Sequence, residues 1–129
     1  MIIDKKDFDE LTAQTKASPW LRCNMDLRNS PEGQSQRMFN PIEPGTEMPI
    51  HPCRNSSETC LCVCGYFEEY FYDVNANLTE TIDIVPGAII LNIPIDQWKS
   101  LKSLEIGTVL PEAKDVPWKP FIEEDIFHV

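Results

Sequence analysis

The sequence predicts an all-β domain, a sandwich or barrel of two antiparallel sheets, with a single helix at its N-terminus. Eleven prolines against five glycines favour short strands and rigid turns over long helices. Only the first segment has helical spacing, whereas the rest of the chain is a series of short runs bounded by turn residues. With 129 residues and no internal repeat, the chain is expected to form one domain.

The helix is predicted within residues 1–19 and is expected to pack on the β domain of residues 20–129. Asp4 can cap its first turn, and Ser18-Pro19 ends it because the residue before a proline disfavours helical dihedrals. The side that faces the β domain is formed by Phe8, Leu11 and Thr15. This side is expected to cover one end or edge of a sheet.

Eight short segments are strand candidates, each limited by proline, glycine, asparagine or serine. They span residues 23–28, 35–42, 47–52, 58–64, 66–73, 81–85, 88–94 and 103–110. The fourth is an apolar run that ends at Gly65, the fifth is aromatic, and the seventh is apolar enough for a buried strand. Residues 115–129 hold too many prolines and charges for a central strand and are expected to wrap around the outside.

The charge and the termini limit the possible partners and the location. The net charge is −10, which makes nucleic acid and anionic membrane surfaces unfavourable partners. No run approaches the roughly 18 apolar residues of a membrane span, and the first residues lack the order of a secretory signal. A cytoplasmic location is therefore expected, where cysteines are normally reduced. The odd count of five cysteines also argues against a closed set of disulfides.

One segment, MPIHPCRNSSETCLCVCG, concentrates the residues that could carry chemistry. It contains a histidine, a glutamate and four of the five cysteines. From Gly45 there are five residues to His51, one to Cys53, four to Glu58 and six to Gly65. This spacing resembles the first motif of the cupin superfamily, G(x)5HxH(x)4E(x)6G, with Cys53 in the place of the second histidine. The resemblance implies a small jelly-roll barrel.

The resemblance also implies one divalent metal ion, for which His51, Cys53 and Glu58 are the candidate ligands. Residues two apart on a strand share a face, and a short loop can bring Glu58 back from the next strand. A thiolate beside an imidazole favours zinc over manganese or magnesium. The alternative is a hydrogen-bonded group in a barrel that has lost its ion and binds no metal.

The second cupin motif, PxGxxH, corresponds to PIDQWK, where Asp96 replaces the glycine and Lys99 stands where the histidine is expected. An ammonium has no lone pair to donate to a metal, and the ordinary pKa of lysine is about 10.4. Lys99 is either an amine that points into the cavity and pairs with Glu58 as a mimic of a cation, or a solvated lysine on a loop.

Most of the chain is also similar to the WbuC-type cupin fold metalloproteins, which are found with bacterial surface-polysaccharide genes. The matching residues are Ser18-Pro19, Asn24, Ser30-Pro31, Gln36 to Asn40, Glu43 to Thr46, Ile93-Pro94, Trp98, Gly107 to Val109, Glu112, Lys114, Pro117 and Trp118. The resemblance implies an isomerase or epimerase that acts on a sugar or nucleotide-sugar. Its metal would polarise a carbonyl or enediol oxygen. The family usually has histidine where Arg28, Cys53 and Lys99 stand.

Cys60, Cys62 and Cys64 alternate along one strand, so they share a face with Glu58 and are expected to line the barrel interior. Their Cα atoms would be about 6.6 Å apart, with parallel rather than converging side chains. Free cysteine is a good small core residue, and core packing is therefore favoured over a metal or redox cluster.

The candidate ligand-binding residues are Arg37, Asn40, Trp98, Lys99, Glu112 and Lys114. Arg37 could bind a carboxylate or phosphate, or form a structural salt bridge. Trp98 could stack on a sugar ring or cap the barrel. Glu112 and Lys114 are two apart, share a face, and could line the cavity mouth or pair with neighbours.

Two classes of function stay open from the sequence. The first is the metalloenzyme that the resemblance implies. The second is a barrel that binds or senses a small anionic ligand without catalysis, with Lys99 and Arg37 as the recognition groups. In both, the expected partner is a small molecule, and the resemblance implies one that is sugar-like. A structural homodimer is a third alternative, since cupins pair through exposed strands. Fold alone does not decide among them.

Overall fold

The computed structural model describes residues 1–19, 24–120 and 122–127. Its elements are α1 (Lys5–Ala17), β1 (Met25–Asp26), β2 (Gln36–Pro41), β3 (His51–Pro52), β4 (Glu58–Leu61), β5 (Phe67–Tyr72), β6 (Leu78–Ile84), β7 (Ile90–Ile93), β8 (Trp98–Ser103), β9 (Val109–Lys114) and the 3-10 helix η1 (Glu123–Asp125). None of the described helices is long and apolar enough to cross a membrane.

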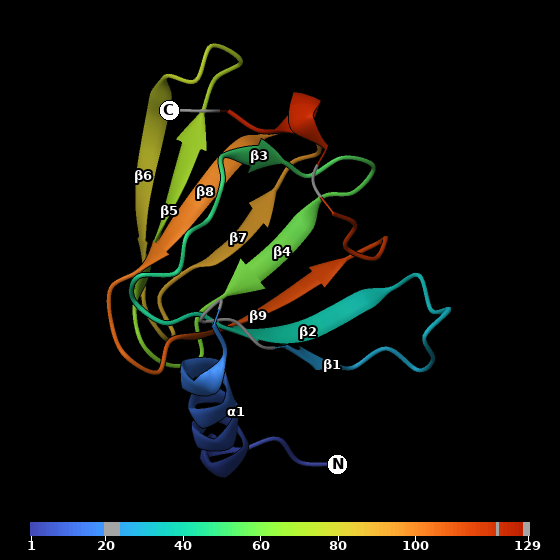
Figure 1. Ribbon diagram of the computed structural model, residues 1–129, viewed down its shortest axis with the longest axis vertical. Helices are drawn as coiled ribbons and strands as arrows, with labels where there is room; N and C mark the ends of the chain where they lie inside the picture. The colour runs from blue at the N-terminus through green and yellow to red at the C-terminus, as the bar shows by residue number, and fades with distance from the viewer. Residues whose placement is uncertain (20–23, 121, 128–129) are drawn as a thin grey trace.

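The strands form two antiparallel sheets that face each other (Figure 1). One sheet has the order β1-β2-β9-β4-β7, and the other has the order β3-β8-β5-β6. Apart from the consecutive pairs β1-β2 and β5-β6, neighbours in each sheet come from distant parts of the chain, as in a jelly roll. The predicted fold class, two antiparallel sheets with one N-terminal helix, is confirmed.

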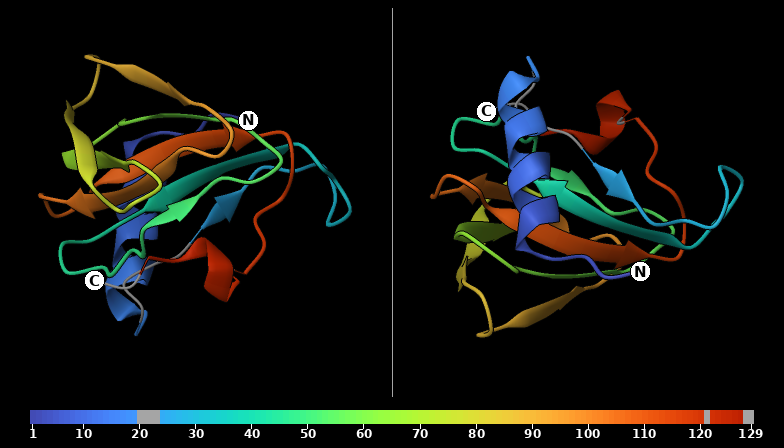
Figure 2. Two further views of the ribbon diagram at one scale, coloured as in Figure 1. Left: turned by 90° about the horizontal axis from the view of Figure 1, so that it is seen from above. Right: turned by 90° about the horizontal axis from the view of Figure 1, so that it is seen from below.

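Helix α1 begins and ends as predicted. The Asp4 side chain accepts hydrogen bonds from the backbone N–H groups of Lys6 and Asp7, and the Asp7 side chain accepts one from Asp4 N–H, which completes a capping box. Leu11 and Thr15 are buried. The Phe8 ring meets Phe39 of β2 edge-on with centroids 5.4 Å apart, so the helix lies against the five-stranded sheet (Figure 2).

The core lies between the two sheets. Its fully buried members are Ile42, Cys60, Cys62, Phe67, Ile84, Ile93 and Leu110. Cys60 and Cys62 therefore pack as core residues, as predicted, whereas Cys64 is only half-buried and forms a bridge with Val109. Gly65 has a positive φ of 87°, and a Cβ there would lie 2.3 Å from Thr108 Oγ1. This position thus requires glycine, because the two backbones touch.

Two strand predictions were wrong, and one strand was missed. Residues 103–110 do not form one strand. They contain the end of β8, which is Ser103, the turn that follows, and the start of β9, which is Val109. Strand β8 was missed because its buried side chains include a lysine and two serines, which hide the apolar alternation. Segment 88–94 is not a buried strand: β7 is an edge strand paired only with β4, and Ile90 is 68% exposed. Cys23, in the first candidate, lies outside the described residues.

The C-terminal segment crosses the open end of the barrel near β3. Phe127 forms a bridge with Ile50, and its ring stacks on Trp98 with centroids 3.9 Å apart. Asp125 of η1 forms an ion pair with Arg54, whose Nη2 atom lies 3.0 Å from Asp125 Oδ1. These contacts hold the segment on the outside of the sheets, as the sequence predicted, and position it over the site described next.

Candidate functional site

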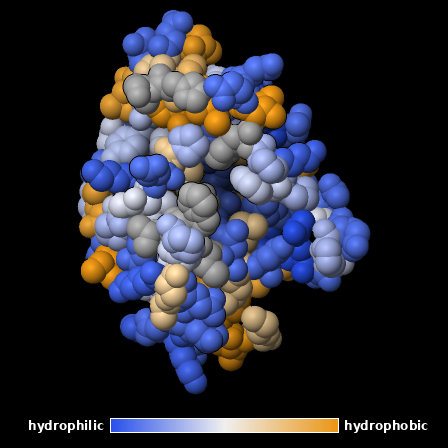
Figure 3. Space-filling view, in the orientation of Figure 1, coloured by the Kyte–Doolittle hydropathy of each residue, from blue (hydrophilic) through white to orange (hydrophobic). Residues whose placement is uncertain are grey.

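Two cavities lie in line at the open end of the barrel. The inner one, here called the chamber, has a volume of about 40 Å³ and is enclosed by both sheets. The outer one, here called the vestibule, has a volume of about 290 Å³ and lies between the barrel mouth and the C-terminal segment. His51, Lys114 and Trp118 line both cavities, so the two adjoin. The face drawn in Figure 3 is hollowed near its centre, among hydrophilic side chains.

The strand registers bring the polar side chains of the chamber together. Glu58 of β4 is paired with Lys114 of β9, and His51 of β3 is paired with Lys99 of β8. Because side chains alternate along a strand, Glu112 lies on the same face as Lys114, two residues away. The chamber therefore receives charged groups from both sheets, and this clustering follows from pairing between segments far apart in the chain.

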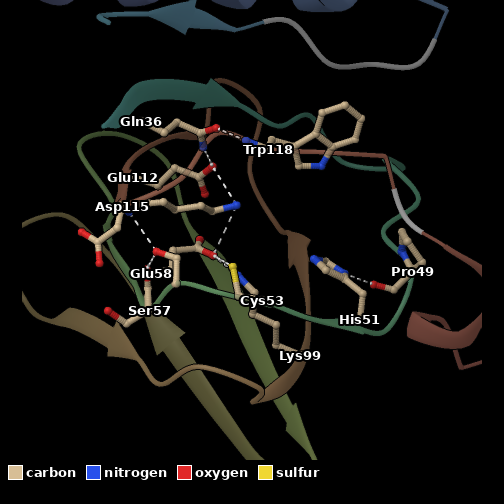
Figure 4. Close-up of polar contacts among 12 residues, drawn as sticks. Gln36, Pro49, His51, Cys53, Ser57, Glu58, Lys99, Glu112, Asp115 and Trp118 are labelled. Carbon is tan, nitrogen blue, oxygen red and sulfur yellow. Dashed lines mark hydrogen bonds and ion pairs between the residues drawn. The ribbon is translucent and has the colours of Figure 1, made fainter. Parts of the chain in front are cut away.

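Glu58 is the centre of an ion-pair network (Figure 4). Lys99 Nζ donates to Glu58 Oε2, and the two side chains are 7% and 3% exposed. Lys114 Nζ lies 3.8 Å from the same oxygen and 4.0 Å from Glu112 Oε1. The Cys53 thiol donates to Glu58 Oε2 at 3.6 Å. One carboxylate thus faces two ammonium groups, and the alternative that Lys99 is a solvated loop lysine is wrong.

The three carboxyl groups of the chamber are driven to different protonation states. Burial is the largest single effect on Glu58 and opposes its ionisation, but the charges of Lys99 and Lys114 and the hydrogen bonds with Glu112 and Lys99 together outweigh it and lower the pKa of Glu58 to about 2. Burial raises the pKa of Glu112 to about 7, and the neighbouring charge of Glu58 adds to this effect. Burial raises the pKa of Glu69 to about 8, partly opposed by Lys99. At neutral pH only Glu58 is fully ionised.

His51 is a neutral imidazole with a defined tautomer. Burial lowers its pKa to about 4, in spite of a hydrogen bond with Pro49. The Pro49 carbonyl, 2.8 Å from Nδ1, can only accept, so Nδ1 carries the proton and Nε2 carries the lone pair. His51 thus contributes no positive charge to the cavities near pH 7.

The predicted metal ligands come together only in part. Cys53 contacts Glu58, and His51 lines the chamber with Glu58. However, burial raises the pKa of the Cys53 thiol, which opposes the thiolate that a metal requires, and Glu58 is engaged by two ammonium groups. In the described part of the chain, no three His, Cys, Asp or Glu side chains form a group that could hold a metal ion. The side chains in this arrangement do not fit a divalent ion.

Of the other predicted site residues, Asn40, Lys99, Glu112 and Lys114 line the chamber. Arg37 does not: it is exposed on the outer side of β2 and donates to the Leu27 carbonyl at 3.1 Å. Strand alternation turns Arg37 away from Gln36 and the interior, so the structure does not bring it together with the other predicted ligand-binding residues.

Trp98 also lies outside the chamber. Its ring is covered by Phe127, and the Arg54 guanidinium lies 5.6 Å from its centroid. These contacts support the reading that Trp98 caps the barrel and are incompatible with a sugar stacked between the same groups.

Sequence reasoning missed Glu69, which is buried and lines the chamber. The signal was present, because Glu69 alternates with Phe67 and Phe71, which contribute to the core, and so must share their inward face. It also missed the contribution of Arg54 and Lys119 to the vestibule. Lys119 lies in no strand and no motif, and Arg54 lies at an unspecified position of the first motif, so only the path of the C-terminal segment reveals their proximity.

Comparison with solved structures shows which fold this arrangement represents. The cupin domain of Schizosaccharomyces pombe Cnp3 superimposes with a TM-score of 0.58 at 13% identity, covering 73% of this chain and 60% of that one. A recombinant oxalate oxidase in complex with glycolate gives 0.60 at 12% identity, covering 78% and 53%. The capsular polysaccharide assembling protein CapF from Staphylococcus aureus gives 0.61 at 21% identity, covering 81% and 29%. The chain thus spans only part of each, and at these identities the likeness shows the cupin fold alone.

Comparison by sequence identifies a family but no curated relative. No curated protein matches the chain. A family model described as "Domain of unknown function (DUF6016)" matches residues 3–84, which include α1, both motif strands β3 and β4, and the strand that carries Glu69. On this match the chain belongs to the DUF6016 family, and its structure is a cupin barrel.

Proposed function

We propose that this protein binds a small anionic molecule at the mouth of its barrel, with lysines in the place of a metal ion. The observation that carries the proposal is the charge of the vestibule. Its lining includes the basic residues Arg54, Lys114 and Lys119 and one acidic residue among those described, Asp125. On a chain with a net charge of −10, such a basic concavity is unexpected unless it attracts an anion.

The chamber reinforces the positive charge of the vestibule. Lys99 and Lys114 are both cationic, whereas only Glu58 among the three chamber carboxyls is fully ionised at neutral pH. An anion near Lys114 would balance this charge. The ion pairs of Lys114 are long, at 3.8 and 4.0 Å, so its ammonium can turn to a ligand with little loss. Arg54, in contrast, is held by Asp96 at 2.8 Å and by Asp125 at 3.0 Å.

The test is a calorimetric titration of the full chain with propionate and with inorganic phosphate at low ionic strength. We expect binding of at least one anion, with affinity that falls as salt is added, because exposed charge interactions are screened. Lys114→Met should weaken binding at least tenfold, whereas Lys102→Met, an exposed lysine of β8, should leave it unchanged. Absence of binding, or equal affinity in the Lys114→Met protein, would refute the proposal.

The alternative proposal is the metal-dependent sugar isomerase or epimerase implied by the resemblance to WbuC-type proteins. The motif spacing and the likeness in fold to CapF, a capsular polysaccharide assembling protein, favour it. It requires Lys99 to leave Glu58 and Cys53 to lose its proton. Elemental analysis of protein purified without added metal decides the matter: stoichiometric zinc, iron or nickel that is lost in a His51→Ala variant supports the enzyme, and protein without metal argues against it.

A further inference from the structure

Two buried oxygens in the chamber have no hydrogen-bond partner among the residues that the structure describes. They are Asn40 Oδ1, on β2 of one sheet, and Glu69 Oε2, on β5 of the other. Asn40 is 3% exposed and Glu69 is 1% exposed, and both line the chamber. Buried polar atoms are almost always paired in folded proteins, so these two indicate a missing partner in the space between them and the mouth.

The size of the chamber limits what that partner can be. A volume of about 40 Å³ holds roughly three water-sized groups, because a single water requires about 10–15 Å³ on this measure. A whole sugar does not fit, but the end of a hydroxylated chain does. The remainder of such a molecule would lie in the vestibule of about 290 Å³, which adjoins the chamber at Lys114 and Trp118.

The charges select the chemical class of the group. An ammonium would be repelled by Lys99 and Lys114, whose Nζ atoms both form ion pairs with Glu58 Oε2. An aliphatic group would leave both oxygens unpaired. A hydroxyl can donate to Asn40 Oδ1, and it can donate to Glu69 or accept from it. The apolar walls formed by Ile42, Leu101 and Leu110 would contact the carbon atoms that carry the hydroxyls.

We propose that the chamber is a hydroxyl-binding subsite, and that the ligand is a hydroxylated organic anion whose hydroxyl end reaches Asn40 and Glu69 while its anionic end lies near Lys114. This inference rests on the proposed function for the anionic end only. The hydroxyl subsite depends on the chamber and its two oxygens, so the two parts can be tested separately.

The experiment compares probes that differ only in their hydroxyls, by titration calorimetry on the full chain. Glycerate is compared with propionate, and threonate with butyrate, because each pair has the same carbon number and charge. Erythritol serves as a neutral polyol. We expect the hydroxylated member of each pair to bind at least tenfold more tightly, which corresponds to about 1.4 kcal/mol.

The variants assign the difference to the chamber. Asn40→Leu and Glu69→Met remove the two oxygens while keeping side-chain size, and each should reduce the preference for glycerate to less than threefold while leaving propionate binding unchanged. Arg37→Met, on the outer side of β2, is the matched control and should keep the full preference. If one chamber variant fails to fold, the other still assigns the preference to the chamber, and equal affinity for the paired probes on the unmodified chain would still overturn the inference.

The outcomes separate the two proposals. Equal affinity for glycerate and propionate would overturn the hydroxyl subsite and leave the anion site standing. Binding of erythritol that depends on Asn40, without binding of any anion, would uphold the subsite and remove the anion site. A preference for glycerate that persists unchanged in both chamber variants would place the hydroxyl contacts elsewhere and overturn the inference. Binding of none of the probes would overturn both.

Discussion

Replacement of Lys99 by methionine tests whether the ammonium is a structural cation of the barrel. The variant keeps an unbranched side chain that is one heavy atom shorter and removes its charge. Glu58 would then stay buried with Lys114 as its remaining cationic neighbour, at 3.8 Å. The protein should therefore lose stability above the ordinary pKa range of carboxyl groups, where Glu58 must either ionise without its main partner or take up a proton.

The loss of unfolding free energy in Lys99→Met can be worked out from the structure in two ways. Removal of one partner from a buried ion pair costs about 3–5 kcal/mol, and the nearby Lys114 favours the lower end of this range. A carboxyl whose pKa falls from 4.5 to about 2 gains about 3 kcal/mol in its ionised form. We therefore expect Lys99→Met to lower the free energy of unfolding by about 3 kcal/mol at pH 7.

The assay is urea unfolding of three proteins at pH 7 and at pH 3. Because the pKa of Glu58 is lowered by folding, its stabilisation is present above about pH 4.5 and is lost as the pH falls toward 2. The deficit of Lys99→Met should thus shrink at pH 3. The double variant Lys99→Met/Glu58→Gln should recover most of the loss at pH 7, and Lys102→Met should change stability by less than about 0.5 kcal/mol.

Two results would contradict this reasoning. A loss below about 1 kcal/mol at pH 7 would mean that water already screens the pair, as at a surface salt bridge. A double variant as unstable as Lys99→Met would mean that the lysine acts through the packing of its methylene groups, since removal of the carboxylate would then restore nothing.

Other predictions concern the core and the remaining carboxyl groups. The pKa of Glu69 is raised from 4.5 to about 8 by burial, so native stability should fall as the pH rises from 4.5 through 8, by about 5 kcal/mol, and Glu69→Gln should flatten this dependence in urea titrations. Gly65→Ala should cost at least about 2 kcal/mol in the same assay, because its Cβ meets Thr108 at a positive φ. Burial raises the pKa of the Cys60 thiol, so this residue should react with maleimide at pH 8 only after denaturant is added, as mass spectrometry of the labelled peptide will show. If lysines replace the metal ion, EDTA should change the melting temperature by less than about 1 °C in a thermal scan.

The fold class could be predicted from the sequence because the signals that indicate it are local. Asp4 caps the helix wherever the helix packs, and the prolines and turn residues divide the rest of the chain into short strands. The spacing from Gly45 to Gly65 placed Glu58 in the interior correctly. The missed strand β8 shows the limit of local reading, since its buried lysine and serines do not alternate in hydrophobicity.

The site was predictable only where strand alternation decides it. Alternation on its own places Glu112 and Lys114 on one face, and it would have turned Arg37 outward and Glu69 inward had it been applied to them. Alternation does not predict which side chains of other strands each of these residues will contact. Whether Lys99 meets Glu58, 41 positions away, depends on both strands facing the same chamber from opposite sheets. The position of Lys99 in the second motif raised this pairing as one of two alternatives, and only the structure decides between them.

By itself, then, the sequence determined a helix, a series of short strands and a row of inward carboxyl, thiol and amine groups. Only the tertiary structure decided what those groups do together. Ionisation in a buried site depends on the distances among charges and on the exclusion of water, and both are properties of the assembled barrel. The pairing of Lys99 with Glu58, the neutrality of His51 and the unpaired oxygens of Asn40 and Glu69 are all consequences of that enclosure.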